Sequence, residues 1–138
     1  MSEKKAISGS CLCGNVQFEI TGPFLDFTFC HCERCRKAMG TAHSTHIFID
    51  PKQVKWISGE KDTTLFLAPN ADNYPRRFCN RCGSPVPRMA RDGVRMVVPA
   101  GLLEDDPQVR PSKNIFWSLK APWTTCEHNL PTFQERPK

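Results

Sequence analysis

The chain has 138 residues, a length that suits one domain with a modest core. Its 19 Lys and Arg residues against 14 Asp and Glu residues give a formal charge of +5, and this excess is scattered, so nucleic acid is not an expected partner. Residues 1–10 lack the apolar core of a signal peptide and no segment is long enough to span a membrane, so we expect a cytoplasmic protein with no membrane contact.

Short alternating segments separated by Pro and Gly predict a mainly β domain. The first is residues 15–21, in which apolar and polar residues alternate until Gly22-Pro23. A short helix is predicted from Glu33 to Met39, because Gly40 suits the left-handed position that follows a helix. Further strands are predicted, in chain order, at residues 44–50, 53–58, 63–68, 94–100 and 114–120.

The eight cysteines fall into three groups and one isolated residue. The groups are Cys11 and Cys13; Cys30, Cys32 and Cys35; Cys79 and Cys82; and the isolated residue is Cys126. Cysteines two or three positions apart suit one metal ion better than disulfides between distant strands. Four disulfides would be the alternative if the protein were exported.

Two of the groups resemble the paired loops of a structural zinc site. Each pair is followed by Gly, which lets the backbone turn tightly beside a metal. Four thiolates from two loops form the tetrahedron that structural zinc prefers. We therefore expect one zinc ion on Cys11, Cys13, Cys79 and Cys82; the alternative is a set of inert buried thiols.

The segment "CHCERC" offers three thiols, Cys30, Cys32 and Cys35, one fewer than a closed zinc site needs. Three protein ligands with an open fourth position are typical of catalytic zinc. The open position can hold water or a substrate thiolate. Either Cys126 or His128 can instead close the site and make it structural.

Other candidate residues have weaker signals. His31 lies between two cysteines and should point away from a metal that they share. His43 and His46 lie on opposite faces of a predicted strand, and each is interpreted as a surface or hydrogen-bonded histidine. Phe116 and Trp123 are expected to pack in the core.

Five segments together resemble the glutathione-dependent formaldehyde-activating enzyme (GFA) or centromere-protein-V type family. They are "GSCLCGNVQFEITGP", "FCHCERCRKAMG", "FCNRCGSPV", "VPAGLLEDDP" and "IFWSLKAPW". The resemblance runs from Gly9 to Trp123 and implies one zinc-binding domain at residues 9–125, with terminal tails at 1–8 and 126–138. It also implies a β-rich "tent" fold of short antiparallel strands with one short helix.

The resemblance further implies two zinc ions per chain. The structural ion would be held by Cys11, Cys13, Cys79 and Cys82, and the catalytic ion by Cys30, Cys32 and Cys35. The family's activity joins formaldehyde to glutathione through a carbon–sulfur bond. One departure is Asn114, which stands where relatives often carry His.

We therefore predict a carbon–sulfur lyase that acts on an adduct of glutathione, or a similar thiol, with formaldehyde or another small aldehyde. A carboxylate-bearing thiol needs cations, for which Arg34, Arg36, Lys37 and Lys120 are candidates. The alternative function is a non-catalytic zinc module that binds a protein or nucleic acid. A fourth protein ligand on the Cys30 group and a contiguous basic face would favour that alternative.

Overall fold

The computed structural model describes residues 5–69, 74–124 and 129–137. Within these residues the chain forms ten strands, one α-helix and four short 3-10 helices. The strands are β1 (Ile7–Ser10), β2 (Gln17–Ile20), β3 (Asp26–Cys30), β4 (Ser44–Ile49), β5 (Val54–Ser58), β6 (Thr63–Leu67), β7 (Pro75–Cys79), β8 (Arg88–Met89), β9 (Met96–Pro99) and β10 (Lys113–Ile115). The helices are α1 (Glu33–Met39) and the 3-10 turns Pro51–Gln53, Glu60–Asp62, Ala100–Leu102 and Trp117–Leu119. None of the helices in this part of the chain is long and apolar enough to cross a membrane.

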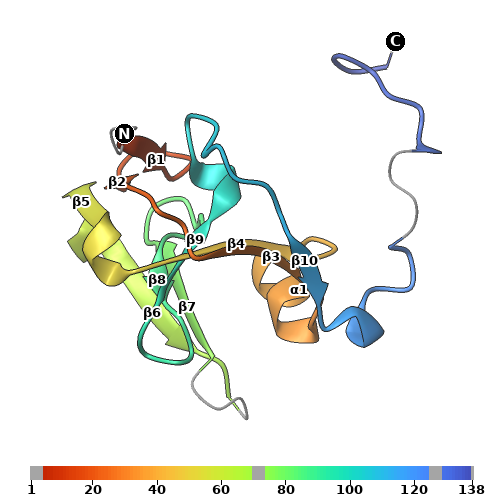
Figure 1. Cartoon of the computed structure of the whole chain (residues 1–138), viewed down its shortest axis with the longest axis horizontal. Helices are drawn as coiled ribbons and strands as arrows, with labels where there is room; N and C mark the ends of the chain where they lie inside the picture. The colour runs from red at the N-terminus through yellow and green to blue at the C-terminus, as the bar shows by residue number, and fades with distance from the viewer. Residues whose placement is uncertain (1–4, 70–73, 125–128, 138) are drawn as a thin grey trace.

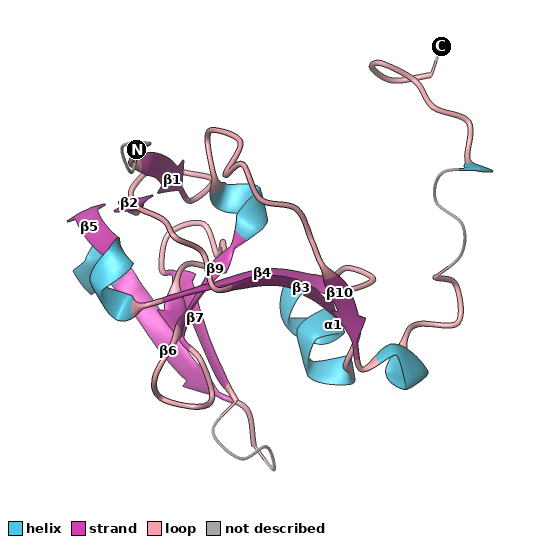
Figure 2. Ribbon diagram, viewed as in Figure 1, coloured by secondary structure: helices cyan, strands magenta, loops and turns pink. Residues whose placement is uncertain are grey.

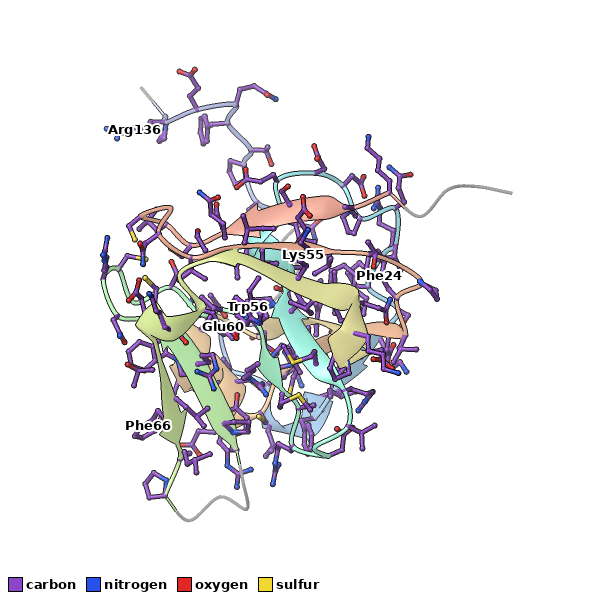
Figure 3. All side chains as sticks on the ribbon, turned by 90° about the vertical axis from the view of Figure 1, so that its left-hand side faces the viewer. Phe24, Lys55, Trp56, Glu60, Phe66 and Arg136 are labelled. Carbon is purple, nitrogen blue, oxygen red and sulfur yellow. The ribbon has the colours of Figure 1, made fainter. Side chains whose placement is uncertain are left out.

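The strands form three sheets (Figures 1 and 2). One is antiparallel in the order β1-β2-β5, and a second pairs β6 with β7. The largest has the order β10-β3-β4-β9-β8, and its pairs are antiparallel except β10–β3, which is parallel. Residues 129–137 run away from the sheets in Figure 1, and Arg136 lies in this segment in Figure 3. The prediction of a mainly β fold with one helix is confirmed.

The five-stranded sheet has two chemically different faces. Arg88 of β8 is aligned with Val97 of β9, which is aligned with Phe48 of β4. At the other end of β4, Ser44 is aligned with Cys30 of β3. Because successive side chains of a strand alternate between faces, one face collects these residues. This face, here called the cavity face, carries Cys30, Ser44, His46, Phe48, Arg88 and Val97.

The opposite face of the same sheet forms the main core. Its buried residues are Phe27, Ile47, Ile49, Met96 and Val98. They pack against Ile7, Phe18 and Ile20 of the three-stranded sheet. Gly9 of β1 lies directly over the Phe18 ring, where any side chain would overlap the ring. The two larger sheets are therefore joined through one apolar layer, which leaves the cavity face free for polar groups.

Helix α1 lies against the end of the five-stranded sheet (Figure 1). It begins after Cys32, whose side chain accepts a hydrogen bond from the backbone N–H of Cys35. It ends at Gly40, which has a φ of 66° and donates its N–H to the carbonyl of Arg36. The predicted helix and its end at Gly40 are confirmed. Glycine suits this left-handed position because it has no Cβ and so avoids steric strain.

Most of the predicted strands are present, with shorter bounds. The segments predicted at 15–21, 44–50, 53–58, 63–68 and 94–100 contain β2, β4, β5, β6 and β9. The prediction at 114–120 was wrong after Ile115: Phe116 adopts a φ of 54°, and a 3-10 turn follows. Strands β1, β3, β7 and β8 were not predicted. β3 has no exposed position and β8 has only two residues. Neither strand therefore shows the alternation of buried and exposed residues that reveals a half-buried strand.

Candidate metal centres and cavity

Four of the predicted zinc ligands meet where two turns approach each other. Cys11 and Cys13 lie in the turn between β1 and β2, and Cys79 and Cys82 lie at the end of β7 and in the turn after it. Their four sulfur atoms all lie within 4.8 Å of one another. The backbone N–H of Leu12 donates to Ser84 Oγ at 2.9 Å, which joins the two turns directly.

The geometry of this four-cysteine site fits zinc. A tetrahedral ion with Zn–S bonds of about 2.3 Å separates its sulfur ligands by about 3.8 Å. The Sγ atoms of Cys11 and Cys13 are 3.6 Å apart, and those of Cys13 and Cys79 are 3.8 Å apart. Backbone N–H groups of Val16 and Arg81 donate to the Cys11 and Cys79 sulfurs at 3.2 and 3.4 Å. These donors suit thiolates, the form in which cysteine binds a metal.

Hydrogen bonding with Ser84 favours the thiolate form of one ligand of this site. The hydroxyl of Ser84 lies 3.4 Å from Cys82 Sγ. Its hydrogen bond, together with the backbone N–H of Ser84, lowers the pKa of the Cys82 thiol to about 5. Cys82 can therefore bind a cation at neutral pH without first losing a proton.

The other three predicted ligands converge at the end of the five-stranded sheet. Cys30 ends β3, Cys32 precedes α1, and Cys35 lies in the first turn of the helix. The three sulfur atoms lie within 4.8 Å of one another, and Cys30 and Cys35 are buried. The seven described cysteines are all free thiols, so the disulfide alternative has no support in the described part of the chain.

The electrostatics of these three thiols favour a bound cation. Hydrogen bonds from Cys30 and Cys35 lower the pKa of Cys32, and the same contact with Cys32 raises the pKa of Cys30. One negative charge is therefore easy to form here, while a second and third repel it. A divalent cation that all three sulfurs contact removes that repulsion. The donor set of this three-cysteine site thus fits zinc with three protein ligands.

A cavity of about 860 Å³ opens on the three-cysteine site. Its apolar lining includes Phe48, Val97, Ile115, Phe116 and Leu119. Its other lining residues include the three cysteines and Arg34, His46, Tyr74, Arg88, Arg91 and Arg95. This volume falls in the range of small-molecule sites and would hold a tripeptide-sized ligand.

Tyr74 connects the sulfurs to the cavity wall. Its side chain is buried, and its hydroxyl lies 3.1 Å from Cys35 Sγ. Burial and the nearby Cys35 raise the pKa of Tyr74 well above its usual value, so the hydroxyl keeps its proton. It therefore donates a hydrogen bond to a Cys35 thiolate, which would hold that ligand in place.

Comparison with known proteins agrees with this arrangement. The family model described as glutathione-dependent formaldehyde-activating enzyme matches residues 6–119. The chain belongs to this family. A Halomonas elongata protein, whose name assigns it provisionally to the same enzyme, is 27% identical over 128 residues that cover 88% of this chain and 81% of that protein.

The crystal structure of a Rhodobacter sphaeroides protein shares the fold. It matches with a TM-score of 0.61 and 22% sequence identity, and the match covers 78% of this chain and 98% of that chain. For this member of the glutathione-dependent formaldehyde-activating enzyme family, the domain limits of 9–125 stay a prediction.

Of the four cations considered for substrate binding, one lies at the cavity and three do not line it. Arg34 lines the cavity, whereas Arg36, Lys37 and Lys120 are not among its lining residues. Lys37 pairs with Glu33 at 2.9 Å on an exposed face of α1, and the Lys120 Nζ lies 4.7 Å from the centre of the Trp117 ring. Substrate binding by Arg36, Lys37 and Lys120 stays a prediction, and the cavity supplies its own arginines.

His31 lies as predicted with respect to the sulfurs, whereas His46 is buried with no partner for Nε2 among the described residues, so its interpretation as a surface or hydrogen-bonded histidine was wrong. His31 points away from the sulfurs: its Nε2 is 2.9 Å from Asn114 Oδ1, and its ring contacts Trp117. Asn114 thus serves as the partner of a buried imidazole. His43 stacks on Phe29, while His46 lies on the cavity face, so the two occupy opposite faces.

Two aromatic predictions were wrong. Phe116 lines the cavity and Trp123 is 64% exposed, so neither packs in the core. The reversal of φ at Phe116 ends β10 and turns its ring toward the cavity rather than the apolar layer.

Sequence reasoning missed most of the cavity lining, in which Tyr74 lies beside the three-cysteine site, Arg88 beside Tyr74, and His46 near Arg88. Tyr74 and Arg88 gave no motif, and His46 was interpreted as an ordinary histidine. Two weak signals were available. Tyr74 is the only tyrosine in the chain, and Arg88 is a charged residue directly after the apolar segment "PVP". Cys126 and His128, which were considered as a fourth ligand, lie outside the described residues.

Proposed function

We propose that the protein is a zinc-dependent carbon–sulfur lyase that acts on an adduct of glutathione, or a similar thiol, with formaldehyde or another small aldehyde. The observation that carries this proposal is the three-cysteine site that opens on a cavity of about 860 Å³. Family membership supports the same chemistry. In the forming direction, the sulfur–carbon bond is made as the thiol adds to the carbonyl carbon, and the thiol proton ends on the carbonyl oxygen.

The two cysteine sites would divide the metal chemistry between them. Cys30, Cys32 and Cys35 would hold the second zinc ion, and Cys11, Cys13, Cys79 and Cys82 the structural one. A zinc ion with an open position lowers the pKa of a thiol that binds it, and thereby favours the thiolate needed for addition. The Tyr74 hydroxyl would keep Cys35 oriented toward that ion.

The lining of the cavity suits a thiol with charged ends. The apolar wall formed by Phe48, Val97 and Ile115 can cover the methylene groups of such a ligand and exclude water. Arginines at the cavity attract carboxylates, which guanidinium groups bind through paired hydrogen bonds. The free thiols of the described chain suit a reducing compartment, so we retain the cytoplasm as the expected location.

The test is an exchange measurement at equilibrium. Zinc-loaded protein is added to glutathione and ¹³C-formaldehyde, and NMR exchange spectroscopy measures how fast label passes between free and thiol-bound forms. We expect faster exchange, and we expect the acceleration to be lost in Cys32→Ser protein, since it lacks one ligand of the second metal. The matched control is Ser112→Ala, which changes a hydroxyl near Asp26 outside the cavity lining. Two bound zinc ions with no acceleration for any small aldehyde would favour the binding-module alternative.

A further inference from the structure

Arg88 is a buried cation with no carboxylate partner among the described residues. Its side chain is 6% exposed, its guanidinium donates a hydrogen bond to the Met89 carbonyl at 3.2 Å, and the same group lies over the Tyr74 ring, 5.4 Å from the ring centre. Burial lowers its pKa, yet a guanidinium stays protonated at neutral pH. The charges of Cys35 and Cys30 offset part of the cost of this burial, but no carboxylate of the described residues uses the paired donors of the guanidinium, which leaves them for a ligand.

The position of Arg88 places this charge beside the candidate reaction centre. Arg88 lies on the cavity face and lines the cavity. Tyr74 contacts both groups: its ring centre lies 5.4 Å from the Arg88 guanidinium carbon, and its hydroxyl lies 3.1 Å from Cys35 Sγ. A ligand joined to the sulfurs can therefore reach Arg88 with a short chain.

His46 adds an uncharged hydrogen-bonding group to the same wall. The side chain is 4% exposed, lines the cavity, and leaves Nε2 without a partner among the described residues. Burial, and then the charge of Arg88, lower the pKa of His46 to about 3, so the ring is neutral and keeps one N–H donor. Across the strand pair, the buried hydroxyl of Thr28 also lacks a partner in the described chain.

The acidic residues of the cavity do not satisfy Arg88. Glu33 pairs with Lys37 at 2.9 Å, and Asp92 pairs with Arg95 at 2.8 Å. Arg88 could still act only as a general counter-charge to the thiolates. As a counter-charge, Arg88 would change the affinity for all ligands by a similar factor. As a binding group, it would raise the affinity only for ligands that carry a carboxylate.

We propose that Arg88 and His46 form a carboxylate-binding subsite beside Cys30, Cys32 and Cys35. This inference rests on the proposed function, because the ligand is the thiol–aldehyde adduct. The carboxylate can come from the thiol, as in a peptide, or from the aldehyde, as in a short oxo acid. In either case the guanidinium binds the two oxygens and the imidazole N–H donates to one of them.

Three stable thioethers test the subsite without requiring catalysis. S-methylglutathione diethyl ester has no carboxylate, S-methylglutathione has carboxylates on the thiol side only, and S-(carboxymethyl)glutathione diethyl ester has one on the aldehyde side only. Calorimetric titration of zinc-loaded protein measures the Kd of each. We expect at least one carboxylate compound to bind roughly 10- to 100-fold more tightly than the ester without a carboxylate, the usual contribution of charged hydrogen bonds. The compound that gains affinity identifies the source.

Variants assign the preference to Arg88. Arg88→Gln should abolish it, and Arg88→Lys should retain only part of it because a lysine lacks the paired donors. Arg110→Gln is the matched control: it removes an exposed cation that pairs with Asp106 outside the cavity lining, and should keep the preference. Equal Kd values for the three compounds in the wild-type protein would overturn the proposal even if Arg88→Gln failed to fold. A preference unchanged in folded Arg88→Gln would also overturn it. Neither result bears on the exchange reaction, which is measured separately.

Discussion

The hydroxyl of Tyr74 lies 3.1 Å from Cys35 Sγ and forms a side-chain hydrogen bond with this candidate metal ligand. Single hydrogen bonds of this kind matter because they fix the direction of the sulfur lone pairs and stabilise the thiolate. The contact is buried, so water cannot easily replace the donor if it is removed.

Tyr74→Phe should therefore weaken the second metal site without unfolding the protein. We expect roughly a 10-fold loss of zinc affinity at the three-cysteine site, the lower end of what such partners contribute. Competition with a chromophoric chelator measures that affinity, and circular dichroism checks the fold. The four-cysteine site is the internal control, and its affinity should not change. Unchanged affinity at both sites would show that the hydroxyl does not support Cys35.

At the scale of residues, the cysteine groups could be predicted but the cavity could not. Ligand spacing in "CLCG", "CHCERC" and "CNRCG" is local, so the sequence alone sorted seven thiols into the two sets that the structure brings together. Arg88 and His46 share a face only because β8, β9 and β4 pair in one register. That register is set by long-range packing, which no short segment encodes.

At the scale of elements, α1 and its flanking residues place two of the three sulfurs of the second site. The helix has only seven residues, so its two ends determine its stability more than its length does. Cys32 starts it and Gly40 ends it. Both signals are local in the sequence, which is why both ends of the helix could be predicted. The end of β10 could not, because it depends on the unusual φ of Phe116.

Alanine substitutions at three glycines should separate backbone strain from steric overlap. Gly40→Ala should cost about 1 kcal/mol of unfolding free energy, because φ is +66° but nothing lies within 4 Å of the added methyl. Gly59→Ala should cost more, since φ is +78° and the methyl would meet the Asn15 backbone. Gly101→Ala is the control with neither problem, and should be close to neutral. Chemical denaturation of the zinc-loaded proteins gives the order, and a loss at Gly101 equal to that at Gly40 would contradict it.

At the scale of the whole molecule, the four-cysteine site joins parts that the apolar layer does not. Cys11 and Cys13 follow β1 of the three-stranded sheet, whereas Cys79 ends β7 of the separate two-stranded sheet. A small cluster around Val16 and Val86 surrounds these sulfurs. The β6–β7 pair also exposes Leu65, Phe66 and Leu67, so it buries little of its own apolar surface. Figure 3 shows Phe66 at the edge of the molecule. We therefore expect this pair to depend on a metal at the four-cysteine site more than the five-stranded sheet does.

The two sites should consequently respond differently to the loss of one ligand. Wild-type protein expressed with zinc should carry two ions per chain by elemental analysis. Cys82→Ser should lose the structural ion together with much of the unfolding free energy, which is only about 5–15 kcal/mol for a domain of this kind. Cys35→Ser should remain folded and keep close to one ion, because the sheet end that carries the three-cysteine site is also held by β3–β4 pairing. Thermal melts by circular dichroism, read beside the zinc content, separate these outcomes. Equal loss of folding in the two variants would mean that the three-cysteine site is structural as well, and one zinc ion or fewer in the wild-type protein would contradict the assignment of two sites.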